Sequence, residues 1–243
     1  MRDARPAVLL DIDDTILDFR SAEAAALRRS FDAMEICADD ALIARYSEIN
    51  RSQWELLEEG VLTRDQVLVR RFELLFEEYG IPRSGAEATE RYENELCRGH
   101  WFMPGAEELL RTLSPDYRLF LVSNGSAKVQ AARLASAGIA GFFERIFISE
   151  ALGAEKPTRE FFDRCFAVIP AFDPARAILV GDSLSSDIRG AKNAGLFSCW
   201  YNYRRRPGRP DIVPDWEIRE LSELPPLLAR LFPTIRETEG EKL

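Results

Sequence analysis

Two acidic segments each follow a short apolar run, and their carboxylates could act together on a cation. Asp11 and Asp13 lie at the end of the first run, and Asp182 and Asp187 follow a later one. In an extended chain Asp11 and Asp13 point the same way, so their charges would converge on one small volume. Close like charges are costly unless a cation or a shared proton offsets them. Each segment also has a simpler interpretation, a solvated turn or a helix cap, which Asp182 fits least well because it precedes the expected helix.

Two further segments add a hydroxyl, an amide and a cation. Ser123-Asn124-Gly125 stands where a helix is expected to begin, and the N–H groups of a helix N-terminus suit an anion. Lys156 stands before Pro157, after another apolar run. Alone, the first segment is ordinary turn chemistry and the second an ordinary surface lysine. Together, the four segments supply what Mg²⁺ and a phosphoryl group require, which are carboxylates, backbone donors and a positive charge.

The four segments should share one edge of a parallel sheet. Several runs are continuously apolar rather than alternating, as in strands that are buried on both faces: Ala7–Ile12, Arg118–Val122, Arg145–Ile148, Ala177–Val180 and Phe197–Tyr201. Segments with helical spacing lie between them: Gly105–Leu113, Ala127–Ala137, Arg159–Ala167 and Ser185–Ala194. This alternation predicts an α/β fold, a Rossmann-like parallel sheet with right-handed crossovers. In such sheets, sites form beyond the carboxyl ends of the strands.

The part of the chain between the first two strands has a different pattern. It carries almost no strand signal and four amphipathic helical stretches: Ala22–Glu35, Asp40–Glu58, Thr63–Tyr79 and Ser84–Cys97. Thr63 and Ser84 are candidate N-caps, and Gly60 and Gly80 are candidate stops. We therefore predict an inserted all-α cap domain at residues 19–100, and a core domain formed by residues 1–18 and 101–243.

Composition narrows the function classes. The chain has 243 residues, of which 46% are hydrophobic, and a net charge of −9, which disfavours nucleic acid and anionic membranes as partners. Its single histidine, His100, argues against a Ser-His-Asp triad or a multi-histidine metal site. The four cysteines are scattered, with no Cys-x-x-Cys, which is typical of inert core residues in a cytosolic protein. No apolar stretch suits a membrane span or a signal peptide. We expect a cytoplasmic protein, either a monomer or a homodimer.

The four segments resemble, in order, the four motifs of the haloacid dehalogenase (HAD) superfamily. These are Asp11-x-Asp13-x-Thr15, Ser123-Asn124, Lys156-Pro157 and Gly181-Asp182-x-x-x-x-Asp187. The match runs from Val8 to about Tyr201, and Asp215–Leu224 looks like that superfamily's last strand and helix. The helical insert resembles the C1 cap class. A narrower similarity, to the pyrimidine 5′-nucleotidase branch, rests on Asn124-Gly125, Asn193–Gly195, Cys199–Asn202, Trp54, Glu59-Gly60, Thr63 and Arg71-Phe72.

The resemblance implies a reaction and a role for each motif residue. Asp11 would attack phosphorus and form an aspartyl-phosphate that water then hydrolyses, with Asp13 as general acid and base. Asp11 and Asp182 would hold Mg²⁺ through their carboxylates and Asp13 through its backbone carbonyl, with Asp187 in an outer position or bound through water. The phosphoryl oxygens would be held by Ser123 and Lys156, with backbone N–H groups near Asn124 and Asp13 assisting and Thr15 as a further phosphate-binding residue. Asp14 stands where many relatives have Gly, a replacement that the nucleotidase branch tolerates.

Residues of the helical insert are expected to choose the leaving group. Trp54, Arg71 and Phe72 could stack on or pair with a base, as could Tyr46, although aromatic residues at helical spacing more often form a core. We expect His100 to be structural. The Arg-rich segment that ends in Arg204–Arg209 suggests a solvated loop beside the site rather than nucleic-acid binding.

The resulting function is a Mg²⁺-dependent phosphomonoester hydrolase that acts on a small phosphorylated metabolite, in particular a pyrimidine nucleoside monophosphate. A sugar-phosphate phosphatase is the alternative. A dehalogenase is disfavoured because its reaction needs no acid at the position of Asp13. A receiver-type phospho-acceptor module is disfavoured because such a domain has its acceptor aspartate on a later strand and lacks a helical insert. A silent binding module would require a broken motif, and none is broken.

Overall fold

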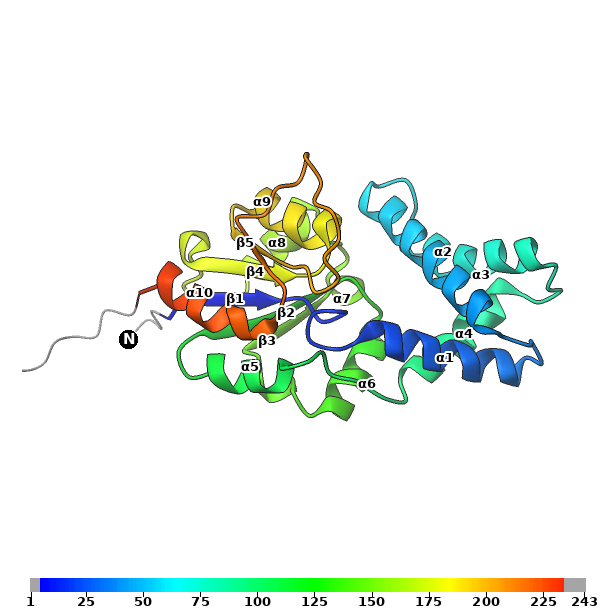
Figure 1. Cartoon of the computed structure of the whole chain (residues 1–243). Helices are drawn as coiled ribbons and strands as arrows, with labels where there is room; N and C mark the ends of the chain where they lie inside the picture. Colours follow the sequence, from blue (N-terminus) through cyan, green and yellow to red (C-terminus); the bar gives the residue numbers. More distant parts are fainter. Residues whose placement is uncertain (1–4, 234–243) are drawn as a thin grey trace, which may run out of the picture.

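The protein is described here by a computed structural model that covers residues 5–233, and it is built around a six-stranded parallel sheet (Figure 1). The strands are β1 (Ala7–Leu10), β2 (Arg118–Ser123), β3 (Arg145–Ile148), β4 (Ala177–Gly181), β5 (Phe197–Tyr201) and β6 (Trp216–Ile218). Their order is β3-β2-β1-β4-β5-β6. The strand order reverses at β1, so the crevice beyond its carboxyl end is where a ligand site is expected.

Alternate residues of each strand enter two different cores, because successive side chains of a strand point to opposite faces. Val8 and Leu10 of β1 pack in the core that contains α5 (Ala106–Leu113), α6 (Ala127–Ala137) and α10 (Leu224–Leu231). Leu9 packs in the core that contains α8 (Arg159–Phe166) and α9 (Arg189–Ala194). Helices therefore cover both faces of the sheet, and this explains why the strands are continuously apolar in sequence. The short helix α7 (Ser149–Leu152) follows β3.

Four helices form a second body beyond the carboxyl ends of the strands (Figure 1). They are α1 (Phe19–Ala33), α2 (Asp40–Glu58), α3 (Arg64–Tyr79) and α4 (Gly85–Leu96). Side-chain caps begin all four, from Asp18, Asp39, Thr63 and Ser84. Their inward faces form a separate apolar cluster that includes Phe31, Tyr46, Phe72, Phe76 and Tyr92. We refer to these four helices as the cap.

The two connections between the cap and the sheet lie side by side. Leu17 pairs with Phe102 in an antiparallel bridge, and the Asp18 N–H donates to the carbonyl oxygen of Trp101 at 2.8 Å. On the other side, the Met103 N–H donates to the carbonyl oxygen of Ile16 at 3.0 Å. These two paired segments connect the cap to the sheet close to the predicted boundaries. The division into residues 1–18 with 101–243 and 19–100 stays a prediction, and its outer ends, residues 1–4 and 234–243, lie outside the described residues.

The α/β, Rossmann-like parallel sheet is confirmed, and the differences from the expected elements are local. The first strand ends at Leu10 and not at Ile12, because the chain turns at once: the N–H groups of Ile16 and Leu17 both donate to the Ile12 carbonyl. The expected helix at 185–194 begins with a π-helical turn at Leu184–Ile188 before α9.

The expectation that the four cysteines are core residues is met only in part. Cys165 and Cys199 are core residues, but Cys37 is exposed, so the cysteines are not uniformly buried. Among residues 5–233, no helix combines the length and the apolar character that a membrane crossing needs.

Candidate active site

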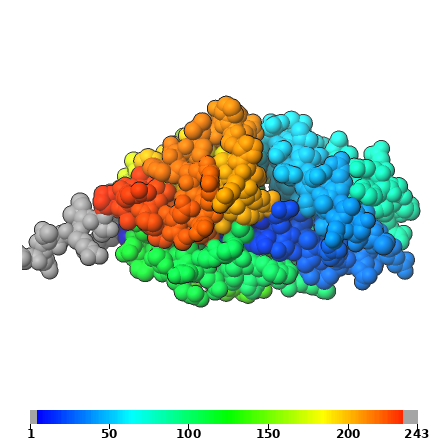
Figure 2. Space-filling view, viewed as in Figure 1, coloured from blue at the N-terminus to red at the C-terminus, as the bar shows by residue number. Residues whose placement is uncertain are grey.

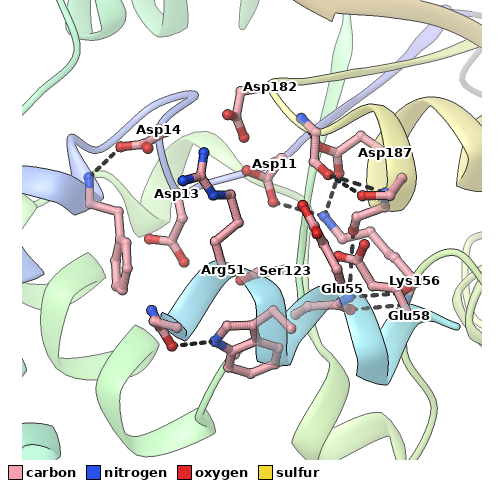
Figure 3. Close-up of a pocket in the computed structure, with 18 of the residues that line it drawn as sticks. Asp11, Asp13, Asp14, Arg51, Glu55, Glu58, Ser123, Lys156, Asp182 and Asp187 are labelled. Atoms are coloured by element: carbon pink, nitrogen blue, oxygen red, sulfur yellow. Dashed lines mark hydrogen bonds and ion pairs between the residues drawn. The ribbon is translucent and has the colours of Figure 1, made fainter. Parts of the chain in front are cut away.

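The loops after β1, β2, β3 and β4 meet at one point, under the cap. There a pocket of about 550 Å³ opens between sheet and cap, and Asp11, Ser123, Lys156 and Asp182 all line it (Figure 3). The space-filling view shows the cap, in blue and cyan, lying against the orange segment that follows β5 (Figure 2). Four segments that are far apart in the sequence are therefore brought together, because parallel strands present their carboxyl ends at the same edge.

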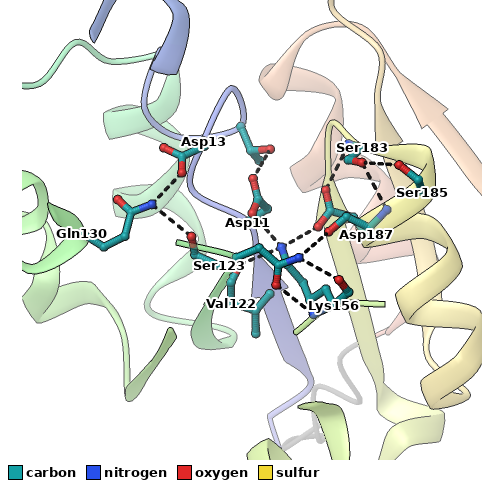
Figure 4. Close-up of polar contacts among 12 residues, drawn as sticks. Asp11, Asp13, Val122, Ser123, Gln130, Lys156, Ser183, Ser185 and Asp187 are labelled. Carbon is teal, nitrogen blue, oxygen red and sulfur yellow. Dashed lines mark hydrogen bonds and ion pairs between the residues drawn. The ribbon is translucent and has the colours of Figure 1, made fainter. Parts of the chain in front are cut away.

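Lys156 is the centre of the charged network (Figure 4). Its side chain is 1% exposed, and its ammonium donates to Asp11 Oδ1 at 2.7 Å, Asp187 Oδ1 at 2.7 Å and the Val122 carbonyl at 3.0 Å. Burial opposes the positive charge, but the two carboxylates outweigh it and raise the pKa of Lys156. Three contacts match the three donors of an ammonium group, so Lys156 is fixed and charged.

Asn124 holds the backbone of Lys156 in place. Its Nδ2 donates to the Lys156 carbonyl at 2.7 Å, and its Oδ1 accepts from the Lys156 N–H at 2.8 Å. The expected phosphate contact at Asn124 was through nearby backbone N–H groups, and the structure adds a role for its side chain, since both ends of the amide position the lysine. At the start of α6, the Ala127 N–H donates to Glu150 Oε2 at 2.6 Å, so this part of the expected anion site carries a carboxylate of the protein itself.

Asp11 is buried among like charges. Its carboxylate accepts from Lys156 and from the Thr15 hydroxyl, whose oxygen lies 3.2 Å from Asp11 Oδ2. Burial is the main cause that raises the pKa of Asp11 to about 8, and Asp187 and Asp13 add to it while Lys156 opposes it. Thr15 was expected to bind phosphate, and the structure places its hydroxyl on Asp11. Asp11 therefore has one cationic partner, Lys156, which does not offset burial and the negative charges of Asp187 and Asp13.

Asp187 lies on the opposite side of Lys156, in the π-helical turn. Its second oxygen accepts from the Ser183 N–H at 3.1 Å, and its side chain is 1% exposed. Gly181 leaves room for the Asp187 carboxylate, because a Cβ at residue 181 would lie 2.1 Å from Asp187 Oδ2. Both oxygens of Asp187 thus accept hydrogen bonds within the protein, and its outer position at the metal site stays a prediction.

Asp13 is held by two residues of α6 that sequence reasoning missed. Gln130 Nε2 donates to Asp13 Oδ2 at 2.6 Å and to the Ser123 hydroxyl at 3.1 Å (Figure 4). The Arg133 guanidinium, which is fully buried, forms an ion pair with Asp13 Oδ1. A spacing of three residues places both side chains on one face of the helix, and their closeness to the Ser123 motif is the only sequence signal that could have found them.

A cation would fit between the carboxylates. Oxygen atoms of Asp11, Asp182 and Asp187 all lie within 4.8 Å of one another. Burial, and next the charge of Asp14, raise the pKa of Asp182, which Arg206 opposes with a contact of 2.8 Å to Oδ2. Three carboxylates thus face two cations, Lys156 and Arg206, and a further positive charge would balance them. Oxygen ligands from carboxylates are those that Mg²⁺ and similar hard cations prefer.

The Arg-rich segment is not simply a solvated loop, which corrects the sequence interpretation. Arg204 donates to Asp14 Oδ2 at 3.0 Å, and Arg206 reaches Asp182. Asp14 has a φ of 59°, a left-handed conformation that Asp tolerates and that explains why Gly suits this position. Its Oδ1 accepts from the Phe19 N–H at 3.0 Å, which ties the first loop to α1.

One face of α2 covers the pocket. It carries residues at helical spacing, and these line the pocket together: Ser47, Asn50, Arg51, Trp54, Glu55 and Glu58. Asn50 joins several of them, since its Oδ1 accepts from Trp54 Nε1 at 3.0 Å and from Arg71 Nη1 at 3.1 Å, and its Nδ2 donates to the buried Glu23 at 2.8 Å. Asn50 and Glu23 were missed, because polar residues in an amphipathic helix are normally assigned to solvent.

The proposed cap residues divide into two groups. Trp54 and Arg71 line the pocket, although Arg71 is only 3% exposed. Phe72 is fully buried in the cap core, against Tyr46, Phe31 and Phe76, and is not among the pocket residues. The structure therefore does not bring Phe72 or Tyr46 to the substrate side. His100 contacts Ser136 at 2.8 Å and packs on Phe102, away from the pocket, as a structural residue would.

Comparison with known proteins identifies the family. A family model described as haloacid dehalogenase-like hydrolase matches residues 6–195. The HAD-hydrolase YfnB of Bacillus subtilis (strain 168) is 42% identical over 217 residues, which cover 89% of this chain and 92% of that protein. Two pyrimidine 5′-nucleotidases are also similar: PynA of Streptococcus pneumoniae, 31% identical over 89% of this chain and 92% of its own, and YjjG of Escherichia coli (strain K12), 30% identical over 92% and 97%.

The fold comparison agrees with the sequence comparison. The crystal structure of YfnB bound to magnesium matches with a TM-score of 0.89, at 41% identity, over 92% of this chain and 98% of that chain. The four strand-end motifs, the sheet order and the matched residues lead to the same assignment: the chain is an enzyme of the haloacid dehalogenase-like hydrolase family.

Proposed function

We propose that the protein is a Mg²⁺-dependent phosphomonoester hydrolase with Asp11 as its nucleophile. An Asp11 carboxylate oxygen attacks phosphorus in line, the bond from phosphorus to the leaving oxygen breaks, and Asp13, which enters this step as the carboxylic acid, gives that oxygen a proton. Asp13 then takes a proton from water, whose oxygen attacks the same phosphorus. The bond to Asp11 breaks and inorganic phosphate leaves. The observation that carries this proposal is the pair of Asp11 and Asp13 on one loop, facing a single pocket.

The two aspartates suit their roles because the protein holds them differently. Lys156 and Thr15 fix Asp11 from two sides, which orients the attacking oxygen. Gln130 and Arg133 fix Asp13, and Gln130 also contacts Ser123, so the acid-base residue and the expected phosphoryl-binding hydroxyl are aligned together.

The residues present fit a Mg²⁺ ion. The carboxylates of Asp11 and Asp182 and the backbone carbonyl of Asp13 would hold it, with Asp187 in an outer position. When bound, the cation supplies charge neutralisation between the nucleophile and the phosphoryl oxygens. Ser123 and Lys156 bind and orient those oxygens from the other side. Lys156 already has three partners, so a phosphoryl oxygen must share its donors with Asp11 or Asp187.

We further propose that the substrates are nucleoside monophosphates, preferentially with pyrimidine bases. PynA and YjjG, both pyrimidine 5′-nucleotidases, support this at 31% and 30% identity over about nine-tenths of the chain. The polar face of α2 adds support, because Trp54 offers an aromatic surface for a base and the Asn50 network offers polar partners beside it. A pocket of about 550 Å³ is in the range of small-ligand sites.

A phosphate-release panel tests the proposal. Wild-type protein is assayed on UMP, dTMP, AMP and several sugar phosphates, with Mg²⁺ and with EDTA. We expect release that requires Mg²⁺ and is fastest with UMP or dTMP. Asp11→Asn should lose activity by at least about 10³-fold, as expected for a missing nucleophile. Equal or faster turnover of sugar phosphates would reject the nucleotidase assignment, and full activity of Asp11→Asn would reject the nucleophile.

A further inference from the structure

The segment after β5 makes an unusual double contact with one residue of the carboxylate cluster. Arg206 Nη2 donates to Asp182 Oδ2 at 2.8 Å and to the main-chain oxygen of Asp182 at 2.7 Å. The same main-chain oxygen accepts from Trp200 Nε1 at 2.8 Å. Arg206 thus joins the backbone and the side chain of Asp182 with one nitrogen, which restricts rotation of the carboxylate about its side-chain bonds.

The loop that carries Arg206 is itself fixed. Asn202 is 2% exposed, and its side chain donates to the Arg206 carbonyl at 2.9 Å and accepts from the Arg206 N–H at 2.8 Å. Asn202 Nδ2 also donates at 3.0 Å to Oε1 of Glu217, which lies in the edge strand β6. The guanidinium therefore starts from a rigid backbone, unlike that of an ordinary surface arginine.

Of the two carboxylate oxygens of Asp182, only Oδ2 accepts a hydrogen bond from Arg206. Within residues 5–233, Oδ1 of Asp182 accepts no hydrogen bond, and Figure 3 shows the carboxylate pointing towards Asp11. Carboxylates that bind metals are commonly held by a hydrogen bond on the oxygen that does not bind, and losing such a partner typically weakens metal affinity about 10–100-fold. Arg206 is such a partner of Asp182, and its contact with Oδ2 leaves Oδ1 to a cation.

Arg204, two residues before Arg206, also forms an ion pair with an aspartate, but this aspartate is Asp14. It donates to Asp14 Oδ2 at 3.0 Å, and its side chain is 24% exposed against 34% for Arg206. Asp14 is not part of the carboxylate cluster. The loop therefore offers two arginines of similar exposure that both line the pocket, of which only Arg206 is paired with an aspartate of the carboxylate cluster.

We propose that Arg206 is a positioning residue for the metal site and that it orients Asp182 for Mg²⁺. The proposal rests on the Mg²⁺ site of the proposed function. It also gives the Arg-rich segment a role in the site, where the sequence alone suggested only a solvated loop. An arginine that merely competed with the cation would have the opposite effect, because its removal would strengthen binding.

Calorimetric titration of Mg²⁺ into the full chain, without substrate, tests the proposal. Arg206→Met should weaken Mg²⁺ binding about 10–100-fold. Arg206→Lys should recover part of this loss, because one ammonium can still reach Asp182. Arg204→Met, the matched control, should bind Mg²⁺ within about threefold of wild type. Circular dichroism and thermal unfolding of each variant establish that it is folded at the titration temperature.

The outcomes separate the two proposals. Equal or tighter Mg²⁺ binding by Arg206→Met would overturn the role of Arg206 and leave the Mg²⁺ site intact. An equal loss in Arg204→Met would also overturn it, because a general effect of loop charge would then explain both variants. Wild-type protein that binds no Mg²⁺ would overturn the metal part of the proposed function and this inference together, whereas phosphate release by the panel above is measured independently.

Discussion

The edge of the sheet and the cap face of the pocket are built in different ways. At the sheet edge, each reactive side chain follows a strand end and is held by at least one charged partner, as Asp11 and Asp187 are by Lys156. On the cap, the pocket residues come from all four helices, and Asn50 joins several of them, since its amide bonds to the Trp54 indole, the Arg71 guanidinium and the Glu23 carboxyl group. The first arrangement suits bond making and breaking, whereas the second, with an indole beside polar groups, suits recognition of the leaving group.

This difference between the sheet edge and the cap face predicts where substitutions should be tolerated. Removing a charge from the sheet edge leaves a buried opposite charge without its partner, which is costly for both stability and catalysis. Removing an uncharged side chain from the cap face of the pocket leaves the chemistry intact and changes which leaving group fits there. The predictions below test this contrast in order of decreasing effect.

Lys156→Met should have the largest effect on the sheet edge. It leaves Asp11 and Asp187 buried without their cation, so we expect a loss of about 3–5 kcal/mol in the free energy of unfolding. Activity should fall about 10²–10³-fold. Urea unfolding and phosphate release measure the two effects. Lys192→Met is the control, because Lys192 is 41% exposed and its ion pair with Asp215 is a surface contact of 3.6 Å. A similar loss in both variants would contradict the contrast.

Phe72→Ala should affect stability and leave the chemistry unchanged. The fully buried ring packs against Tyr46 at a centroid distance of 4.7 Å, so its removal opens a cavity in the cap core. We expect a loss of about 3–5 kcal/mol in unfolding free energy. The kcat/KM on p-nitrophenyl phosphate, measured well below the unfolding temperature, should stay within about threefold. A fall in kcat/KM for nucleotides but not for p-nitrophenyl phosphate would instead indicate that Phe72 helps to recognise the base.

Glu58→Gln should change how stability depends on pH. Burial is the main cause that raises the pKa of Glu58 from 4.5 to about 7, and one of its oxygens is buried without a partner among the described residues. Between these two values the folded protein keeps a proton that the unfolded chain has released, so stability falls as pH rises through this window. Glu58→Gln removes that penalty.

The expected gain for Glu58→Gln is about 1–3 kcal/mol above pH 7 and close to zero near pH 4. Urea unfolding at pH 4, 5.5 and 8 measures it. Glu55→Gln, the same substitution at an exposed position of the same helix face, should show no such trend. A gain that is independent of pH would contradict the assignment to Glu58 ionisation.

Trp54→Ala should have the smallest and most selective effect. The indole lines the pocket and donates to Asn50, so its loss removes a stacking surface for the base. We expect kcat/KM for UMP to fall about tenfold, equivalent to about 1.4 kcal/mol. With p-nitrophenyl phosphate, which has no base, kcat/KM should change less than twofold. An equal fall on both substrates would show that the cap face acts on the chemistry and would break the contrast between the two regions.

The motif residues at the strand ends were predictable because their spacing and their neighbours are local. Asp11, Ser123, Lys156 and Asp182 each follow an apolar run that forms a strand, and parallel strands must end at a common edge. The cap helices were predictable for a similar reason, since Thr63 and Ser84 carry side-chain caps where expected. The early end of β1 was missed because a turn stabilised by Ile12 competes with continuation of the strand.

The partners of the motif residues could not be predicted. Arg133 reaches Asp13 across 120 positions of the chain, and Arg204 reaches Asp14 across 190. The surroundings of the two cap aromatic residues could not be predicted either, because both occur at helical spacing. Trp54 faces the pocket, whereas Phe72 lies in the cap core.

The sequence by itself determined the family, the parallel sheet and the residues that carry the proposed chemistry, because these depend on residue types at short spacing. The tertiary structure alone decided that Thr15 and Asn124 hold other residues of the site, that Phe72 is core, and that Arg206 faces Asp182. The physical reason is that a hydrogen bond or an ion pair depends on distances of a few ångströms in space. Only packing of the cap, the sheet and the loop after β5 brings those distant side chains together.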